Sequence, residues 1–408
     1  MGTSIFRKKI TRPFYGWAIV FAAFLIQTVT GGVGSTISAF FLIPMSQALG
    51  VGRTAISIGI SSRSVASDIS SPVIGPILDK HGPKMLLVIG ALLSGFAVMA
   101  LGGVTQYWHY ITLSVIVGLV GSAGLGMLIP TTTVSRWFVH RRGRAIAIST
   151  AGISVGVALF GPIAQGLISS IGWRWAWVFL GASIWILVIP VSLAFMKRSP
   201  EDMGLMPDGD ESRSHSLQTT SPKPENEAVW TLSMAAHTRS LWMLLVAYSL
   251  GGTAFSGIQV HQVPAILDRF TPLLAAETVF LFGVTSTISK LIFGFISERI
   301  AVQHLIIVCF TGCGLSVLFL SQGSSSEMIL AFGVSYGLIR GGYSTLQSIV
   351  WAEYFGRSYL GTIRGVFQPV NILSMAAGPL IAGILFDVFN DYNFAFSLFT
   401  LLYLLAAG

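Results

Sequence analysis

Apolar residues along this chain occur in long, nearly uninterrupted runs that are separated by short polar stretches. Each run is about as long as the roughly 20 residues that an α-helix needs to cross the hydrocarbon core of a bilayer. The pattern therefore predicts an all-α membrane protein with twelve transmembrane helices. They cover residues 15–44, 54–77, 85–104, 109–135, 144–169, 175–196, 240–264, 275–297, 303–321, 326–352, 362–386 and 392–408.

The only long polar stretch divides these helices into two sets of six. Residues 197–238 are rich in Ser, Pro, Asp, Glu and Lys, a composition typical of a flexible linker. We therefore expect an N-terminal six-helix bundle over residues 1–196, a linker over 197–238 and a C-terminal six-helix bundle over 239–408.

Short motifs repeat between the two halves. Gly75–Lys80 at the end of the second predicted helix matches Gly294–Arg299 at the end of the eighth, 219 residues later. Gly161-Pro162 returns as Gly378-Pro379 at an offset of 217 residues. Two pseudo-symmetric bundles with a binding site between them, near the middle of the membrane, are typical of alternating-access carriers.

Composition excludes several classes of protein. Hydrophobic residues make up 53% of the chain and charged residues 10%, which is too little charge for a soluble fold of this size. The sequence has no Walker loop, no dinucleotide-binding loop, no His/Cys metal cluster and no spaced catalytic triad. We therefore predict that the protein is not an enzyme and that it uses no cofactor and no metal.

The formal net charge of +8 is explained by membrane topology rather than by nucleic-acid binding. Of the 24 Lys and Arg residues, 18 lie in or beside loops on one side of the predicted membrane and three lie on the other side. Because cytoplasmic loops carry the excess of Lys and Arg, both termini and the linker should be cytoplasmic. We expect a monomeric, multi-pass protein of the plasma membrane or bacterial inner membrane.

The segment Gly75–Lys84 resembles the signature loop between the second and third helices of the major facilitator superfamily. This resemblance extends over nearly the whole chain and implies the two-bundle fold. It also suggests a gating role for the charged residues of this loop and of its repeat. These residues are Asp79, Lys80, Glu298 and Arg299.

Other segments resemble the monocarboxylate transporter and oxalate/formate antiporter branch of that superfamily. They are Phe14–Trp17, Gly52–Thr54, Pro200–Gly209 and Lys290–Gly294. Animal members of the branch have an arginine at the position of Lys290, which pairs with a substrate carboxylate. They have an aspartate at the position of Ser286, which takes part in proton coupling. This chain thus keeps the cation and lacks the coupling acid.

Four charged residues lie inside predicted helices, where each costs about 2.5–3.5 kcal/mol. For Lys290 and Arg340 the leading hypothesis is that both face a central cavity and hold a substrate carboxylate. The alternatives are that Lys290 reaches the cytoplasmic interface to join a gating network with Glu298, and that Arg340 forms a salt bridge between the halves.

The other two charged residues, Arg63 and Asp68, are five positions apart and therefore about 140° apart around a helix, so they should not pair. Arg63 could bind substrate or pair with a distant acid. Asp68 could form a structural ion pair, act as a gate or carry a coupling proton. Polar residues in a membrane more often join helices than touch a substrate. The neutral or titratable candidates for the path are Gln27, Tyr248, Gln259, His261, Gln368 and Asn371.

Three intramembrane cations against one intramembrane acid favour an anionic substrate. The leading hypothesis is a secondary carrier of small mono- or dicarboxylates, driven by proton symport or by anion exchange. An exporter of amphipathic compounds is an alternative, which would predict a more apolar cavity lined by acids. A transporter-like membrane receptor is the alternative from another class.

Overall fold

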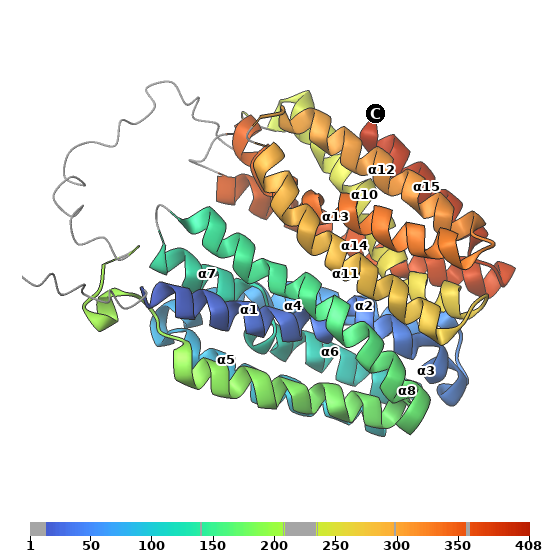
Figure 1. Ribbon diagram of the computed structural model, residues 1–408, viewed down its shortest axis with the longest axis horizontal. Helices are drawn as coiled ribbons and strands as arrows, with labels where there is room; N and C mark the ends of the chain where they lie inside the picture. Colours follow the sequence, from blue (N-terminus) through green and yellow to red (C-terminus); the bar gives the residue numbers. More distant parts are fainter. Residues whose placement is uncertain are drawn as a thin grey trace, which may run out of the picture.

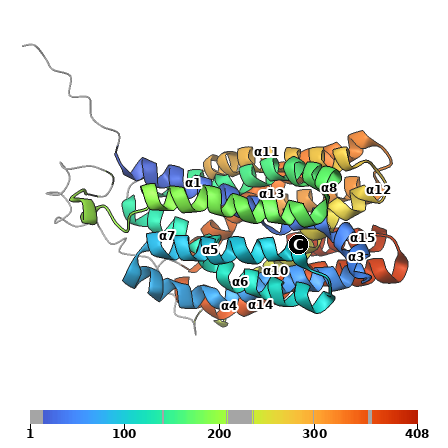
Figure 2. The same ribbon diagram turned by 90° about the horizontal axis from the view of Figure 1, so that it is seen from below.

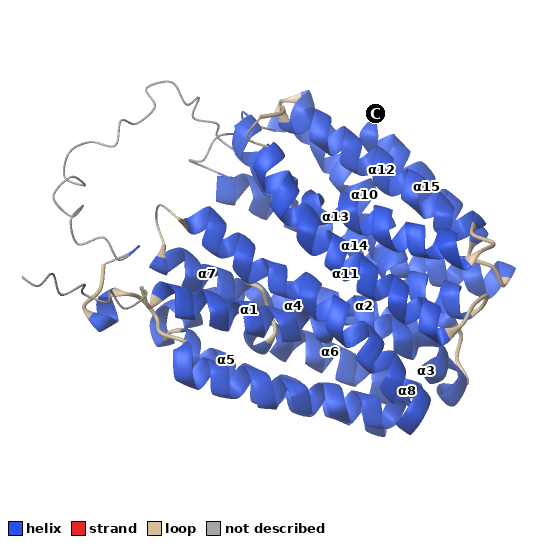
Figure 3. Ribbon diagram, in the orientation of Figure 1, coloured by secondary structure: helices blue, strands red, loops and turns tan. Residues whose placement is uncertain are grey.

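The computed structural model describes residues 14–138, 141–206, 208, 234, 236–297, 299–355 and 360–408. Most of the predicted linker, residues 209–233, and the predicted gating residue Glu298 lie outside the described residues, as does the side chain of Asp79. Within the described ranges the chain forms helices and no strands, as Figure 3 shows. This confirms the all-α prediction.

The N-terminal half contains ten described helical elements and a short 3₁₀ helix follows it. The α-helices are α1 (Gly16–Gly32), α2 (Ser35–Ser38), α3 (Leu42–Leu49), α4 (Arg53–His81), α5 (Pro83–Ala100), α6 (Tyr107–Gly124), α7 (Leu128–Trp137) and α8 (Arg142–Phe195), and the 3₁₀ helices are η1 (Ala39–Phe41), η2 (Leu101–Gly103) and η3 (Glu201–Met203).

The C-terminal half follows with longer and more regular helices. They are α10 (Arg239–Leu267), α11 (Pro272–Ile296), α12 (Val302–Gln322), α13 (Ser326–Phe355), α14 (Leu360–Phe389) and α15 (Asn393–Ala407).

Two predicted helices are broken in the structure, and one predicted break is confirmed. The predicted span 15–44 is broken after α1, where Gly34 is extended and begins α2, and the span 109–135 is broken between α6 and α7. The spans 144–169 and 175–196 are the two arms of α8, which turns sharply at Gly172. Gly172 has φ 84°, a left-handed value that glycine adopts without the steric penalty of a Cβ atom.

Eight segments of the described chain are long and apolar enough to cross a membrane, counting both arms of α8 as one segment. The helices α4, α13 and α15 fall short of that criterion. In α4 the polar residues Arg63 and Asp68 interrupt the apolar surface, and α15 has only 15 residues. Each predicted span contains helical structure, but the count of twelve membrane crossings remains a prediction.

The two halves meet along two seams. The first arm of α8 packs against α11, and α4 packs against α14. Figure 1 shows the N-terminal half below the C-terminal half, and Figure 2 shows α8 with α11 at one edge and α4 with α14 at the other. Because α11 repeats α4 and α14 repeats the first arm of α8, the seams are reciprocal.

Glycines bring equivalent helices close together in the two halves. A Cβ atom on Gly156 of α8 would collide with the carbonyl oxygen of Thr28 on α1. A Cβ atom on Gly378 of α14 would likewise collide with the carbonyl oxygen of Thr253 on α10. Small residues allow such backbone contact in membrane proteins, so the sequence repeat is also a repeat of helix packing.

The bundle has two distinct ends. We call the end at which α4, α7 and α8 finish, at His81, Trp137 and Phe195, the linker end, which lies at the left of Figure 1. The opposite end carries the connections at residues 50–52, 268–271 and 390–392 and is called the clamp end, for contacts described below.

Candidate functional site

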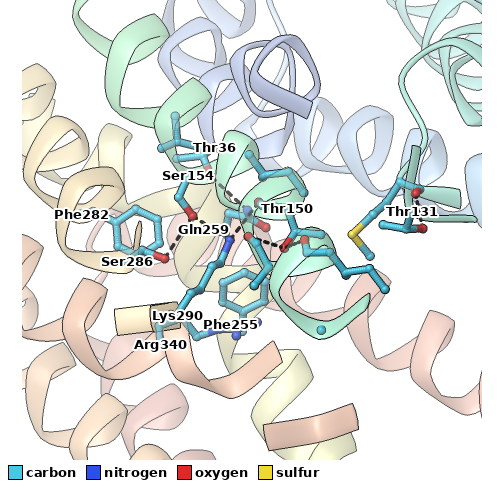
Figure 4. A pocket seen from close by; sticks show the side chains of 17 residues that line it. Thr36, Thr131, Thr150, Ser154, Phe255, Gln259, Phe282, Ser286, Lys290 and Arg340 are labelled. Atoms are coloured by element: carbon cyan, nitrogen blue, oxygen red, sulfur yellow. Dashed lines mark hydrogen bonds between the residues drawn. The ribbon is translucent and has the colours of Figure 1, made fainter. Parts of the chain in front are cut away.

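A cavity of about 550 Å³ lies between the halves and is lined by α7 and α8 on one side and by α10, α11 and α13 on the other. We call it the α8–α11 cavity; Figure 4 shows its lining. Its volume lies within the roughly 300–1,000 Å³ typical of small-molecule sites. Near the linker end its wall includes Thr131 and Gly143, so the cavity extends toward that end.

Lys290 on α11 lines this cavity and contacts α8 across the seam. Its Nζ donates to Ser154 Oγ at 2.8 Å and to the backbone oxygen of Thr150 at 3.3 Å (Figure 4). Ser154 Oγ lies 3.3 Å from Ser286 Oγ. Ser286 occupies the position at which the family resemblance would place an aspartate. A hydroxyl therefore stands where a carboxylate could have neutralised the ammonium group.

Arg340 on α13 lines the same cavity and is held between aromatic rings. Its Cζ atom lies 3.6 Å from the centroid of the Phe255 ring and 4.0 Å from that of Tyr343. Cation–π contacts of this kind stabilise a guanidinium while leaving its N–H groups available in the plane. The Nε atom is buried and has no hydrogen-bond partner among the described residues.

Two further predicted site residues lie near this pair. Gln259 lines the cavity, and its Nε2 donates to Thr36 Oγ1 at 2.9 Å. Tyr248 does not line it: the residue is 3% exposed, and its ring lies 5.4 Å from that of Tyr343, which contacts Arg340. Tyr248 thus supports the aromatic layer around the guanidinium.

The electrostatics of the α8–α11 cavity are one-sided. Lys290 and Arg340 line it, and no Asp or Glu belongs to its described wall. Two uncompensated cations between apolar side chains favour an anion, and carboxylate oxygens can accept charge-assisted hydrogen bonds from both. The remaining wall is mostly apolar, with Met127, Val157 and Phe282 among its residues.

A second cavity of about 400 Å³ lies at the other seam, between α1, α4 and α6 on one side and α14 on the other. We call it the α4–α14 cavity. It brings together four predicted residues, Arg63, Asp68, Gln368 and Asn371. Arg63 and Asp68 form no ion pair with one another, in agreement with their helical spacing; the ion pair present among the described residues joins Arg53 to Asp268. The predicted binding set is thus divided between two cavities.

The clamp end is closed by contacts between the halves. Both terminal nitrogens of Arg53 on α4 donate to the Asp268 carboxylate at 2.7 Å, and one also donates to the Tyr392 hydroxyl at 2.9 Å. Asp387 on α14 accepts hydrogen bonds of 3.0 Å from the backbone nitrogens of Arg53 and Thr54, so it caps the N-terminus of α4. Burial alone would lower the pKa of Arg53, but its hydrogen bonds to Asp268 and Tyr392 raise it.

His261 belongs to this closure rather than to a cavity wall. The buried imidazole lies 2.9 Å through Nδ1 from the Tyr392 hydroxyl, and its Nε2 lies 3.0 Å from Ser57 Oγ and from the Pro379 carbonyl oxygen. We define the clamp as the residues that make these contacts and those of the preceding paragraph. They are Arg53, Ser57, His261, Asp268, Asp387 and Tyr392.

Several residues of the first cavity and the clamp were missed by sequence reasoning. Arg53 was counted only as a loop charge, although the Gly52–Thr54 motif that contains it could have marked it. Ser154 and Phe255 resemble ordinary helix residues in sequence. Of the predicted gating residues, Lys80 and Arg299 are exposed at the linker end, and their role stays a prediction.

The sequence matches a family of known proteins over most of its length. The sequence model of the family described as Major Facilitator Superfamily matches residues 19–278 and 263–408, in two overlapping stretches. The chain belongs to the major facilitator superfamily. This result confirms the resemblance to the superfamily that was inferred from the segment Gly75–Lys84.

Similar members of the superfamily include named carboxylate transporters. Monocarboxylate transporter 12 of Xenopus laevis is 27% identical over 94% of this chain and 85% of that protein. The rat protein of the same name is 25% identical over 94% of this chain and 82% of its own. The MFS transporter asaE of Aspergillus flavus is 25% identical over 79% of this chain and 69% of its own.

A solved structure supports the superfamily fold. A bacterial homologue of the human lysosomal transporter Spinster, in an inward-facing and unoccupied conformation, superposes with a TM-score of 0.65. That alignment covers 93% of this chain and 84% of the other, at 15% sequence identity.

In the described residues no group of three or more His, Cys, Asp or Glu could hold a metal ion.

Proposed function

We propose that this major facilitator protein is a secondary carrier of small mono- or dicarboxylates, which bind between Lys290 and Arg340. The observation that carries the proposal is that both cations line one cavity whose described wall contains no acid. Arg340 can grip a carboxylate with two parallel hydrogen bonds, and Lys290 adds a point charge. Relatives named as monocarboxylate transporters support the substrate class.

The proposed mechanism is alternating access across the two seams. In this state the clamp closes one end, while the α8–α11 cavity extends toward the other. In the proposed orientation the linker end is cytoplasmic and the clamp end faces outward, with a monomer in the cell membrane and both termini in the cytoplasm. Opening the clamp and closing the linker end would then move the substrate across.

Two driving forces fit this carrier, proton symport and anion exchange. Exchange is favoured because Ser286 replaces the acid expected for coupling, and no carboxylate lines the described wall around Lys290. Exchange needs only that the loaded carrier reorients more easily than the unloaded one. A ligand that offsets the charges of Lys290 and Arg340 would have this effect.

The test is uptake of labelled carboxylates by protein reconstituted in liposomes, with wild type, Lys290→Gln and Arg340→Gln. We expect wild type to exchange external label for internal unlabelled acid, and both variants to lose this activity while keeping normal expression. Undiminished exchange by both variants would exclude the assignment. Uptake that requires a pH gradient instead of an internal acid would establish symport.

A second candidate follows from the apolar side chains in the same wall, such as Met127, Val157 and Phe282. They suit an amphipathic anion, which would make the protein an exporter. Efflux of hydrophobic carboxylates from loaded liposomes, without exchange of small ones, would identify this function. Binding without transport of either kind would favour the receptor alternative.

A further inference from the structure

The α4–α14 cavity has a wall of its own. It shares no lining residue with the α8–α11 cavity, and the two walls adjoin at two breaks between helices. Ser35 lines one cavity and Thr36 the other, where α2 begins. Beside this point, in the wall of the α4–α14 cavity, Thr30 Oγ1 donates to the backbone oxygen of Leu125 at 2.8 Å and joins the ends of α1 and α6. The two cavities therefore adjoin but have different linings, and we call them the first and the second chamber.

The second chamber carries both signs of charge. Arg63 and Asp68 on α4 line it, and neither makes an ion pair or a hydrogen bond with a described residue. A charged residue inside a membrane protein marks a functional site by default, because its burial is costly without compensation. The first chamber presents two cations and no acid, whereas this one presents one of each.

Polar groups from the other half complete the chamber. Gln368 and Asn371 line it from α14, and their amides can both donate and accept hydrogen bonds. A ligand bound here would touch Arg63 and Asp68 of the N-terminal half and these amides of the C-terminal half. It would therefore bridge a seam that must change during alternating access.

We propose that the α4–α14 cavity is a second binding site, for a zwitterion that carries a carboxylate and an amine. The guanidinium of Arg63 would bind the carboxylate, and Asp68 would accept hydrogen bonds from the ammonium group. The two residues are offset by about 7.5 Å along the helix axis, which favours a zwitterion whose charges are several bonds apart. ω-Amino acids have this chemistry. The proposal does not depend on the carboxylate site, because the chambers share no residue.

The test measures the melting temperature of the full chain, purified in detergent, against ω-amino acids of increasing length from glycine to 6-aminohexanoate. The double variant Lys290→Gln with Arg340→Gln serves as the background, so that both cations of the first chamber are removed. We expect the longer members to raise the melting temperature, because a ligand that binds only the folded state stabilises it. Hexanoate and hexylamine, which carry one charge each, should have no such effect.

Two substitutions locate the site. In the same background, Arg63→Gln and Asp68→Asn should each weaken binding about tenfold or more, as expected for loss of a charge-assisted contact. The melting temperature without ligand and the gel-filtration profile report whether each variant folds, and Asp68→Asn changes almost no volume. The proposal is overturned if no ω-amino acid stabilises the protein, if stabilisation survives both substitutions, or if hexanoate and hexylamine act equally.

Discussion

The ammonium group of Lys290 on α11 donates a 2.8 Å hydrogen bond to the hydroxyl of Ser154 on α8, so one side chain both faces the cavity and joins the two halves. A lysine has three N–H donors, and here Ser154 and the Thr150 carbonyl accept two of them. The third is available to a ligand oxygen. Substrate binding can thus add to the contact across the seam without first breaking it.

The first prediction separates the charge of Lys290 from its contact with Ser154. Ser154→Ala removes the hydroxyl but keeps the ammonium group, so carboxylate affinity should change less than about threefold, the effect of a weak neutral hydrogen bond. Lys290→Gln should weaken the same binding about tenfold or more. Isothermal titration with the best carboxylate measures both. Equal losses in the two variants would mean that the seam contact, and not the charge, controls binding.

Sequence reasoning predicted where most helices lie and which charged residues lie inside them, but not which of these residues share a cavity. Apolar runs located the helices because the bilayer requires a minimum length. The bend at Gly172 falls in the predicted gap between two spans, whereas the break at Gly34 was missed, because it lies inside a long, mostly apolar run and only the backbone conformation reveals it. Lys290 and Arg340 could be singled out because charges inside a membrane are costly.

The division of the predicted site into two chambers could not be foreseen. Arg63 and Arg340 look alike in sequence, as single arginines deep in a span, yet they line different cavities. The pairing of Arg53 with Asp268 joins residues 215 positions apart. Such contacts depend on how the two halves meet, and local spacing along one helix contains no information about that.

The second prediction concerns the aromatic support of Arg340. Phe255→Leu keeps an apolar side chain but removes the ring that lies 3.6 Å from the guanidinium. A desolvated cation–π contact contributes about 0.5–2 kcal/mol, so carboxylate affinity should fall by a factor of roughly 2–30. Arg340→Lys should lose at least as much, because an ammonium group cannot bind both carboxylate oxygens in parallel.

The control for this pair is Phe282→Leu, which alters the same cavity wall at a ring that stacks on Tyr336, whereas the rings beside Arg340 are Phe255 and Tyr343. Binding is again measured by titration. An affinity loss in Phe282→Leu equal to that in Phe255→Leu would point to the shape of the wall instead of the cation–π contact.

The third prediction is that the ion pair of Arg53 and Asp268 holds the clamp end closed. Spin labels at Gly103 and Ser324 would report the separation of the halves, since both residues are exposed near this end and a Cβ atom on Gly103 meets no neighbour. The native Cys309 and Cys313 are buried and should not react with the label. Arg53→Gln should increase the population with a long distance between labels.

The reversed pair, Arg53→Asp with Asp268→Arg, is the control for charge. If attraction between the two side chains stabilises closure, the double variant should recover part of the short-distance population that each single variant loses. An unchanged distance distribution in Arg53→Gln would show that the remaining clamp contacts suffice without the ion pair.

The last prediction concerns Asp387, which caps α4 from the opposite half of the protein. Its carboxylate accepts hydrogen bonds from the backbone nitrogens of Arg53 and Thr54, and its negative charge also favours the positive end of the helix dipole. Loss of a helix cap costs about 1 kcal/mol, so Asp387→Ala should open the clamp end several-fold more often in the same distance measurement. Asp391→Ala is the matched control, because that carboxylate contacts Asn393 at the start of α15. Combined with Arg53→Gln, Asp387→Ala should add less than its separate effect, since both substitutions release the same closure. Full additivity would instead indicate that the cap and the ion pair act on different motions.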